Sequence, residues 1–214
     1  MENILIIGAN GNTGRKVVEG LQEMEGYNPV AMVRKDKQKN RFEENGVDAR
    51  IGDLEEDFSQ VFENIDKVIF AAGSGGSTGD DKTEAVDKNG AMKAIDFAVE
   101  KNVDKFVMLS SMGTDNPNRV EGLETYLKAK KAADDHLKKS DITYTVVQPG
   151  GLTDEDGTGK VELENKLGKF GQISREDVAR TLIASLGNDM AKNTSFELLK
   201  GEQPIQEALK KVSN

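Results

Sequence analysis

Short apolar runs alternate with amphipathic stretches along the first two thirds of the chain. The apolar runs predict strands at 4–7, 30–33, 48–51, 67–71, 105–109 and 144–147, and the stretches between them predict helices from 12, at 37–45, from about 83 to 101 and from about 120 to 139. Because the runs at 67–71 and 106–109 are apolar at nearly every position, we expect them to be buried on both faces. The pattern predicts an α/β fold, a three-layer doubly wound parallel sheet of the Rossmann type.

The rest of the chain is expected to complete the same single domain, over residues 1–214. Its pattern predicts a helix at 174–186, a strand at 195–199 and a closing helix at 204–212. Residues 150–214 would form a small extension on the substrate side. The polar, glycine-punctuated stretch 152–172 is expected to form part of a pocket rim.

A glycine-rich loop follows the first predicted strand, with the sequence Gly8-Ala9-Asn10-Gly11-Asn12-Thr13-Gly14. Glycines at this spacing let a chain leave a buried strand, bring its backbone against a pyrophosphate and begin a helix whose N–H groups face the anion. A kinase-type phosphate loop is excluded, because Gly14 is followed by Arg15-Lys16-Val17 rather than by Lys and then Ser or Thr. The loop therefore predicts a dinucleotide site; the alternative is a purely structural turn.

The second predicted strand ends at Arg34-Lys35-Asp36, where NAD-selective folds place an acidic side chain for the ribose 2′-hydroxyl. A guanidinium matches the 2′-phosphate of NADP instead, so Arg34 predicts NADP(H) as the preferred cofactor and NAD(H) as the second option. Arg15 is placed either to reach the same phosphate or to lie at the surface. The alternative for Arg34 and Lys35 is a solvated pair at a strand end.

The residues that follow the other strands are also candidate cofactor contacts, because ligands of doubly wound sheets lie beyond the carboxyl ends of the strands. Asp53 is placed to accept from the adenine amino group, or else to cap a short helix at 55–62. The turn Ala71-Ala72-Gly73 is small enough to lie flat against a ribose, or else is only a turn. The segment 73–79 is interpreted as a mobile loop flanking the cofactor. Further strand-end candidates are Ser110, Ser111, Gln148 and Pro149.

Candidate chemistry comes from Tyr126 and Lys130, whose spacing puts both on one face of the predicted helix 120–139. An ammonium and a cationic nicotinamide would favour the phenolate form, so Tyr126 could protonate a reduced carbonyl. Ser111 would hold the carbonyl oxygen, and Lys130 would also bind the nicotinamide ribose. The alternative is a chance spacing on a basic, solvated helix, which also carries Lys128, Lys131, Lys138 and Lys139.

Charge and composition narrow the classes of partner. The net charge of −9 argues against nucleic acid or an anionic membrane, and the absence of cysteine excludes thiolate chemistry. Without a signal-peptide pattern or an apolar run of membrane-spanning length, a cytoplasmic protein with a small-molecule substrate is expected. No metal is expected: the acidic stretch 154–159 imitates a calcium loop but has Asn165 where a bidentate Glu belongs. His136 is expected near the surface without an obvious partner.

The whole set of motifs resembles the short-chain dehydrogenase/reductase superfamily: GANGNTG at 8–14, VRKD at 33–36, GDL at 52–54, AAG at 71–73, LSSMGTDNP at 109–117, YLKAK at 126–130, QPGGL at 148–152 and ISREDVA at 173–179. Over essentially the full chain it is most similar to the atypical, NmrA-like branch, which includes NAD(P)H-dependent flavin and biliverdin-IXβ reductases. The resemblance implies cofactor binding by Gly8, Gly11, Gly14, Arg34, Asp53 and the adjoining Leu54, and a catalytic set of Ser111, Tyr126 and Lys130.

The chain also departs from the family pattern. The tyrosine-glycine pair of extended members is absent after Ser111, Asp87 replaces an Asn that helps some members relay protons, and Gln148 stands where relatives commonly carry Arg. Three functions are therefore weighed. The leading hypothesis is NADPH-dependent hydride transfer to a small carbonyl, quinone or flavin acceptor. The others are a non-catalytic NAD(P)-sensing regulator and, more weakly, a sugar-nucleotide epimerase or dehydratase. The oligomeric state is left open.

Overall fold

A computed structural model describes residues 1–74, 79–187 and 189–212 of the chain. The helices are α1 (Asn12–Gln22), α2 (Asp36–Glu44), α3 (Asp80–Lys82), α4 (Ala91–Glu100), α5 (Glu124–Lys139), α6 (Arg175–Ala184) and α7 (Ile205–Val212), with a π-helical segment η2 (Thr83–Gly90) and 3₁₀ turns η1 (Ser59–Phe62) and η3 (Pro117–Arg119). The strands are β1 (Glu2–Ile7), β2 (Tyr27–Val33), β3 (Asp48–Ile51), β4 (Lys67–Phe70), β5 (Lys105–Leu109), β6 (Thr143–Pro149), β7 (Gly151–Thr153), β8 (Lys160–Glu164), β9 (Gln172–Ser174), β10 (Thr194–Lys200) and β11 (Gln203–Pro204).

The described strands form one large sheet, in the order β11-β8-β10-β6-β5-β4-β1-β2-β3, and a separate parallel pair, β7 and β9. Pairing is parallel from β3 through β10, and β8 and β11 add an antiparallel edge. The chain winds outward from β1 in both directions, so the carboxyl ends of β1 and β4 diverge at a switch point. In sheets of this kind a ligand occupies that crevice.

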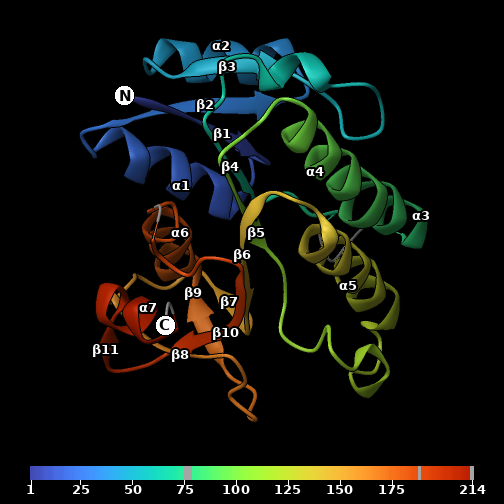
Figure 1. The fold of residues 1–214 in the computed structure, drawn as a ribbon, viewed down its shortest axis with the longest axis vertical. Coiled ribbons are helices and arrows are strands. Elements are labelled where there is room, and N and C mark those ends of the chain that lie inside the picture. The colour runs from blue at the N-terminus through green and yellow to red at the C-terminus, as the bar shows by residue number, and fades with distance from the viewer. Residues whose placement is uncertain (75–78, 188, 213–214) are drawn as a thin grey trace.

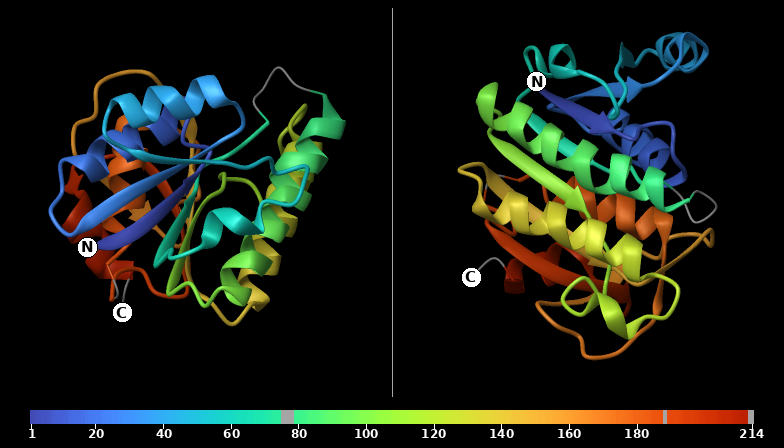
Figure 2. Two further views of the ribbon diagram at one scale, coloured as in Figure 1. Left: turned by 90° about the horizontal axis from the view of Figure 1, so that it is seen from above. Right: turned by 90° about the vertical axis from the view of Figure 1, so that its right-hand side faces the viewer.

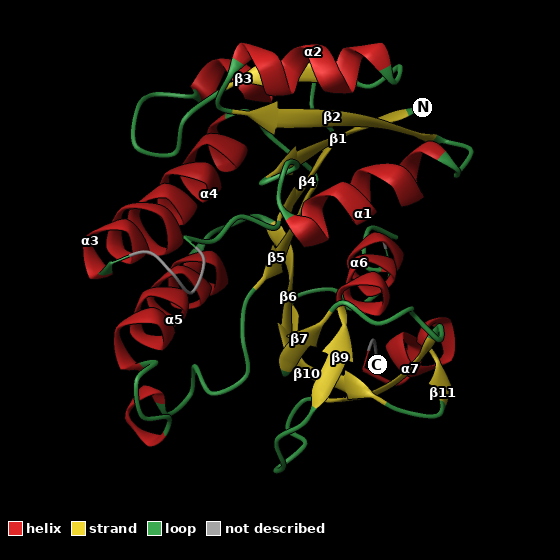
Figure 3. Ribbon diagram, turned by 180° about the vertical axis from the view of Figure 1, so that it is seen from behind, coloured by secondary structure: helices red, strands yellow, loops and turns green. Residues whose placement is uncertain are grey.

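Helices cover both faces of the sheet, as Figures 1 and 3 show. The side of α1, α6 and α7 holds one core, in which Ile4 and Ile6 of β1 pack with Val17 and Leu21 of α1. The opposite side holds the second core, where α4 and α5 run side by side (Figure 2). Alternate residues of β1 enter opposite cores because successive side chains of a strand point to opposite faces. The prediction of a three-layer, doubly wound α/β sheet is confirmed.

All the predicted strands are present, and the errors lie in helix starts. The expected helix 55–62 is only the turn η1, because Asp53 and Asp57 accept hydrogen bonds from the backbone N–H groups of Glu55 and Ser59 and so compete with helical bonding. The helix expected from about 120 begins at Glu124, because Gly122 has a φ of +79° that no helix accommodates.

The stretch 152–172 was expected only as a polar rim, but it contains β8 and leads into β9. Buried Val161 and Leu163 alternate with outward polar residues in β8, a pattern of a half-buried edge strand. Strands this short, flanked by glycine, give a weak signal in sequence. The interpretation of 73–79 as a mobile loop falls largely outside the described residues, since 75–78 are not among them.

Candidate functional site

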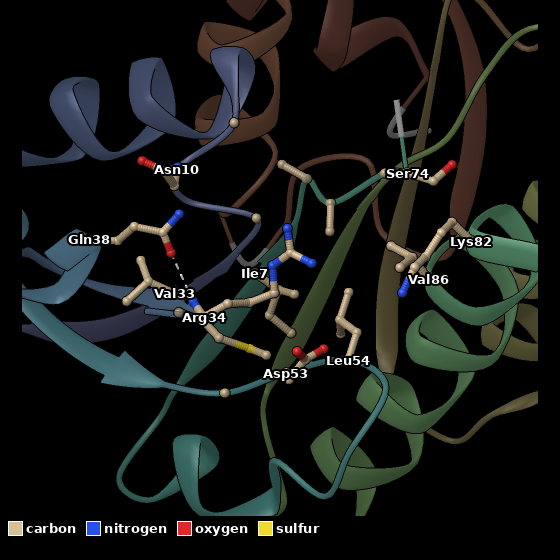
Figure 4. Close-up of a pocket in the computed structure, with 17 residues that line it drawn as sticks. Ile7, Asn10, Val33, Arg34, Gln38, Asp53, Leu54, Ser74, Lys82 and Val86 are labelled. Carbon is tan, nitrogen blue, oxygen red and sulfur yellow. Dashed lines mark hydrogen bonds between the residues drawn. The ribbon is translucent and has the colours of Figure 1, made fainter. Parts of the chain in front are cut away.

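A cavity of about 380 Å³ opens at the carboxyl ends of β1, β2, β3 and β4 (Figure 4). Nine of the predicted cofactor-binding residues line it: Gly8, Asn10, Gly11, Arg34, Asp53, Leu54, Ala71, Ala72 and Gly73. The wall also includes Gly52 of the GDL motif and Ser74 of the segment expected to flank the cofactor. Gln38 and Lys82 line it as well, although no sequence motif indicated them. The cavity therefore lies where the switch point of the sheet predicts a ligand.

The glycine loop approaches the end of β4 too closely for side chains. Gly8 has a φ of +90°, and a Cβ there would lie 2.6 Å from the backbone nitrogen of Ala72. A Cβ on Gly14 would lie 2.1 Å from the carbonyl oxygen of Gly8. Both contacts are with backbone atoms that cannot move aside. Glycine at these two positions therefore lets the loop pack backbone against backbone, while its approach to a pyrophosphate stays a prediction.

Helix α1 begins directly at this loop with its N-terminus uncapped. Its N-cap is Gly11, which has no side chain to accept a bond, and its first turn holds no acidic residue. Among the described residues, no backbone carbonyl accepts from the N–H groups of Asn12, Thr13 or Gly14. These donors, together with the helix dipole, suit a pyrophosphate. The structure thus fits a dinucleotide on its own geometry.

Arg34 extends over the middle of the cavity, with Asp53 and Leu54 below it in Figure 4. The backbone at Arg34 is fixed because the Gln38 Oε1 atom accepts from the backbone N–H groups of Arg34 and Lys35, at 3.1 Å each. A second cation, Lys82, lines the far wall and donates to Glu55 Oε1 at 2.6 Å. Because Glu55 already compensates the charge of Lys82, Arg34 is the better placed of these two cations to meet an anionic group of a ligand.

Asp53 fixes the turn that replaces the helix expected at 55–62, and it also lines the cavity, where the adenine contact stays a prediction. Its Oδ1 atom accepts from the backbone N–H of Glu55 at 3.1 Å, which fixes the turn, and its side chain lines the cavity. Asn12, Thr13, Gly14, Ser110 and Pro149 do not line the cavity. Arg15 donates to Asn10 Oδ1 at 2.9 Å, so it supports the loop from behind.

A buried ion pair between Lys130 and Asp87 lies beside the cavity, in contact with the backbone of Ala72. The Lys130 side chain is only 3% exposed, and its Nζ atom lies 3.0 Å from Asp87 Oδ1. It also donates to the carbonyl oxygens of Ala72 at 3.2 Å and Leu109 at 3.4 Å. The interpretation of α5 as uniformly solvated is wrong at this position: Lys130 turns inward, whereas its neighbour Lys131 is 43% exposed and pairs with Asp135.

Burial opposes a charge on Lys130, but its neighbours reverse that effect. Desolvation lowers its pKa, while the fields of Tyr126, Asp87 and Asp134 and the hydrogen bond to Asp87 raise it, and the net pKa lies above the ordinary value. The Nζ atom lies 5.8 Å from the centroid of the Tyr126 ring, which confirms that the two side chains share one face of α5. Lys130 is therefore a fixed cation beside a phenol.

The serines after β5 face different partners. Ser111, expected to hold a carbonyl oxygen, is half-buried and donates to the carbonyl of Met112 at 3.2 Å. Ser110 is buried and donates at 2.7 Å to Asp134 Oδ2, a carboxylate that the sequence reading did not single out. The Asp134 carboxylate also accepts from Gln148 Nε2 at 3.2 Å. Burial raises the pKa of Asp134 to about 6, although Ser110, Lys138, Gln148 and Lys130 each lower it.

Two features outside the cavity have structural partners. His136 Nε2 lies 2.6 Å from Asp96 Oδ1 of α4, so the expectation that it lacked a partner is wrong. In the loop 154–159, backbone N–H groups of Thr158 and Gly159 donate to Asp177. The described residues contain no group of three or more His, Cys, Asp or Glu side chains arranged to hold a metal ion.

A family model described as NAD(P)H-binding matches residues 8–189. The chain belongs to this NAD(P)H-binding family. Its relative YhfK from Bacillus subtilis, named an uncharacterized sugar epimerase, is 44% identical over 98% of this chain and 99% of its own. Two solved structures also match. A protein from Bacillus halodurans, provisionally named an NAD-dependent epimerase/dehydratase, has a TM-score of 0.94 at 39% identity, covering 99% and 100% of the two chains. The oxidoreductase ylbE from Lactococcus lactis has a TM-score of 0.86 at 27% identity, covering 98% and 96%.

Membership of the NAD(P)H-binding family confirms the resemblance to the NmrA-like branch of the short-chain dehydrogenases/reductases. The protein is therefore an NAD(P)H-binding protein with a fold of the Rossmann type. Within the part of the chain that the structure describes, no helix is long and apolar enough to cross a membrane.

Proposed function

We propose that this NAD(P)H-binding protein is an NADPH-dependent reductase that transfers hydride to a small carbonyl, quinone or flavin acceptor. The observation that carries the proposal is the buried Lys130, which joins the cavity wall at Ala72 to the end of β5 at Leu109 and stands beside the Tyr126 ring. A buried cation beside a phenol, at the ligand edge of the sheet, is an arrangement that catalyses proton transfer.

The residues at successive strand ends would each hold a different part of the cofactor. The N-terminus of α1 and the glycine loop would bind the pyrophosphate. Arg34 and Lys82 would bind the 2′-phosphate, and Asp53 would accept from adenine. Lys130, Ser110 and Pro149 lie on the side of β4, β5 and β6, so they are assigned to the nicotinamide half. The cofactor supplies the hydride.

Tyr126 would supply the proton when the acceptor is a carbonyl. Its ring is half-buried on α5 and lies against the Lys130 ammonium, which stabilises a phenolate and so lets the phenol release its proton. Ser111, half-buried at the end of β5, would bind the carbonyl oxygen by exchanging its hydrogen bond to Met112 for one to substrate. A flavin or a quinone is more easily reduced than a carbonyl, so it depends less on proton donation by Tyr126 and on oxygen binding by Ser111.

Steady-state oxidation of NADPH with carbonyl, quinone and flavin panels tests the proposal. With a carbonyl acceptor, Tyr126→Phe is expected to lower kcat by about 100-fold or more, the contribution of a positioned general acid. With a flavin acceptor the same variant should hardly change kcat. Tyr27→Phe, a half-buried tyrosine of β2, is the matched control and should leave both rates unchanged. No turnover with any panel, in a protein that binds NADPH, would contradict the proposal and support a sensing role.

The epimerase name carried by YhfK raises a second candidate, the conversion of a sugar nucleotide. The described residues after Gly151 argue against it. Strands β8, β10 and β11 join the main sheet, and α6 packs on α1, so this segment is used to complete the sandwich. Little of it is left to enclose a second nucleotide. Epimerisation of a nucleotide sugar by the purified protein would overturn this assignment.

A further inference from the structure

Besides Asp87, a second buried carboxylate, that of Asp134, lies against Ser110 in the part of the site assigned to the nicotinamide half. Asp134 is 2% exposed and lies on α5, one turn beyond Lys130. Its Oδ2 atom accepts from Ser110, the first residue after β5, and from Gln148 of β6. Its Oδ1 atom is buried without a hydrogen-bond partner among the described residues. A buried oxygen without a partner is costly, so this position calls for a reason beyond packing.

The elements around Asp134 supply little opposite charge. Helix α5 contributes Lys130 and, at the surface, Lys138, and η2 contributes Asp87. The neutral donors are Ser110, directly after β5, and Gln148 of β6, which also donates to Thr114 Oγ1. Because Lys130 already pairs with Asp87 at 3.0 Å, the buried group of three is neutral when Asp134 is protonated and carries one negative charge when it is ionised.

This buried group lies at the carboxyl end of β5, in contact with the cavity wall at Ala72. Ser110, which binds Asp134, is the first residue after β5, and Lys130 binds the carbonyl of Ala72 in the cavity wall. An oxidised nicotinamide ring is cationic and a reduced one is neutral. A buried anion nearby therefore favours the oxidised form and the charge that develops during hydride departure.

Resting on the proposed function, we propose that Asp134 is a positioning residue for hydride transfer: acting with Lys130 and Asp87, its ionised carboxylate shifts the site's preference from NADPH toward NADP⁺. Protonation of Asp134 neutralises the group and removes this preference. No covalent step is involved, because the Asp134 proton exchanges with solvent and the hydride passes from cofactor to acceptor. The site is thereby stronger as a hydride donor in the ionised state.

The direction of the pH dependence follows from burial. Since burial raises the pKa of Asp134 to about 6, the carboxylate changes from neutral to charged as the pH rises through that value. Affinity for NADP⁺ relative to NADPH is therefore expected to rise between about pH 5 and about pH 8. The expected rise is roughly tenfold, as for a unit charge acting through protein at an effective dielectric constant of about 20.

Equilibrium titrations of NADPH and NADP⁺ at both pH values test this inference without turnover. In the wild type, the Kd for NADPH divided by the Kd for NADP⁺ should rise between the two pH values. In Asp134→Asn, this ratio should be low at both pH values. Asp135→Asn is the matched control: it removes an equal charge from the next position of α5, where Asp135 is 42% exposed and pairs with Lys131. Its ratio should follow the wild type.

A second variant keeps the carboxylate. Ser110→Ala removes a hydrogen bond that favours the charged form of Asp134, so the rise in the Kd ratio should move to higher pH. An unchanged profile in both Asp134→Asn and Ser110→Ala would overturn the inference and leave the proposed reductase standing. Failure of the wild type to bind either nucleotide would overturn the proposed function and this inference together.

Discussion

The two halves of the candidate site are built from different material. Around the cavity at β1, β2 and β3, the walls are backbone atoms and exposed cations such as Arg34 and Lys82. Beside the ends of β5 and β6, the site consists of buried side chains: Lys130 pairs with Asp87, and Asp134 accepts hydrogen bonds from Ser110 and Gln148. The first half is exposed to water and can bind a charged ligand from solution. The second half is buried, so a change in its charge acts strongly on groups nearby.

Binding and chemistry are therefore assigned to different parts of the fold. A backbone cradle contributes the same donors whatever the protonation state, so it suits a pyrophosphate of constant charge. Buried ionisable groups are costly to assemble but respond strongly to a change of charge nearby. Variants in the first half should therefore alter affinity, whereas variants in the second should alter turnover and pH dependence.

The largest expected effect comes from the cradle itself. Gly14→Ala would place a Cβ 2.1 Å from the Gly8 carbonyl oxygen, so loop and helix must separate. Calorimetric titration should then detect no NADPH binding, and the melting temperature should fall. Gly151→Ala is the control, since its Cβ reaches only ordinary contact with Gln172 at 3.4 Å. Normal NADPH affinity in Gly14→Ala would break the claim that the backbone forms the first half.

A large effect on stability and turnover is expected from the buried pair. Lys130→Met leaves Asp87 buried without its cation, which costs about 3–5 kcal/mol in the free energy of unfolding. Lys131→Met, which breaks the exposed pair with Asp135, should cost at most about 1 kcal/mol. Denaturant unfolding measures both. The double variant Lys130→Met/Asp87→Leu should recover stability but not carbonyl reduction; recovery of both would deny Lys130 a chemical role.

Arg34 tests the electrostatics of the first half alone. Arg34→Gln removes the planar cation proposed to bind the 2′-phosphate, and the preference for NADPH over NADH should fall by about 10- to 100-fold in kcat/KM. The neighbouring cation Lys35 is exposed and does not line the cavity, so Lys35→Gln is a matched control. An equal loss in both variants would show that only overall charge matters.

The sequence predicted the first half better than the second for a physical reason. Gly8 and Arg34 follow directly after strands, and Gly11 and Asp53 lie within four residues of a strand end, so a motif and its place in the strand order suffice to put them at the cavity. Lys82, in contrast, reaches the cavity from α3, and nothing local marks it. Its position depends on how α3 docks, which no short pattern encodes.

The carboxylate of Asp134 was not predicted for the same reason, because its position depends on contacts between distant parts of the chain. The spacing of Tyr126 and Lys130 predicts a shared face of α5, and the structure agrees. Asp134 looked like one more charge on a solvated helix, because its partners, Ser110 and Gln148, come from two other elements. A contact between residues 24 positions apart leaves no mark in a local pattern. Similarly, the short strand β8 pairs with β10 more than 30 positions away, and β11 pairs with β8 in turn, so neither pairing is visible in a local pattern.

The smallest expected effect is on the pH dependence of stability. Because burial raises the pKa of Asp134 to about 6, its contribution is fully present below the unfolded value near 4 and is lost as the pH rises through 6. Asp134→Asn should match the wild type at about pH 4 and exceed it by about 1–3 kcal/mol at about pH 7. Urea unfolding across this range measures it; a constant difference would show that Asp134 does not titrate there.

Mixing the NADPH-loaded protein rapidly with excess acceptor, while following the absorbance of the reduced nicotinamide, tests the central claim most directly. We expect at least one carbonyl, quinone or flavin to oxidise bound NADPH much faster than it oxidises free NADPH. With a carbonyl acceptor, that rate should fall sharply in Lys130→Met and stay unchanged in Lys131→Met. Tight NADPH binding without oxidation by any of the three acceptor classes would contradict the account and identify a sensor.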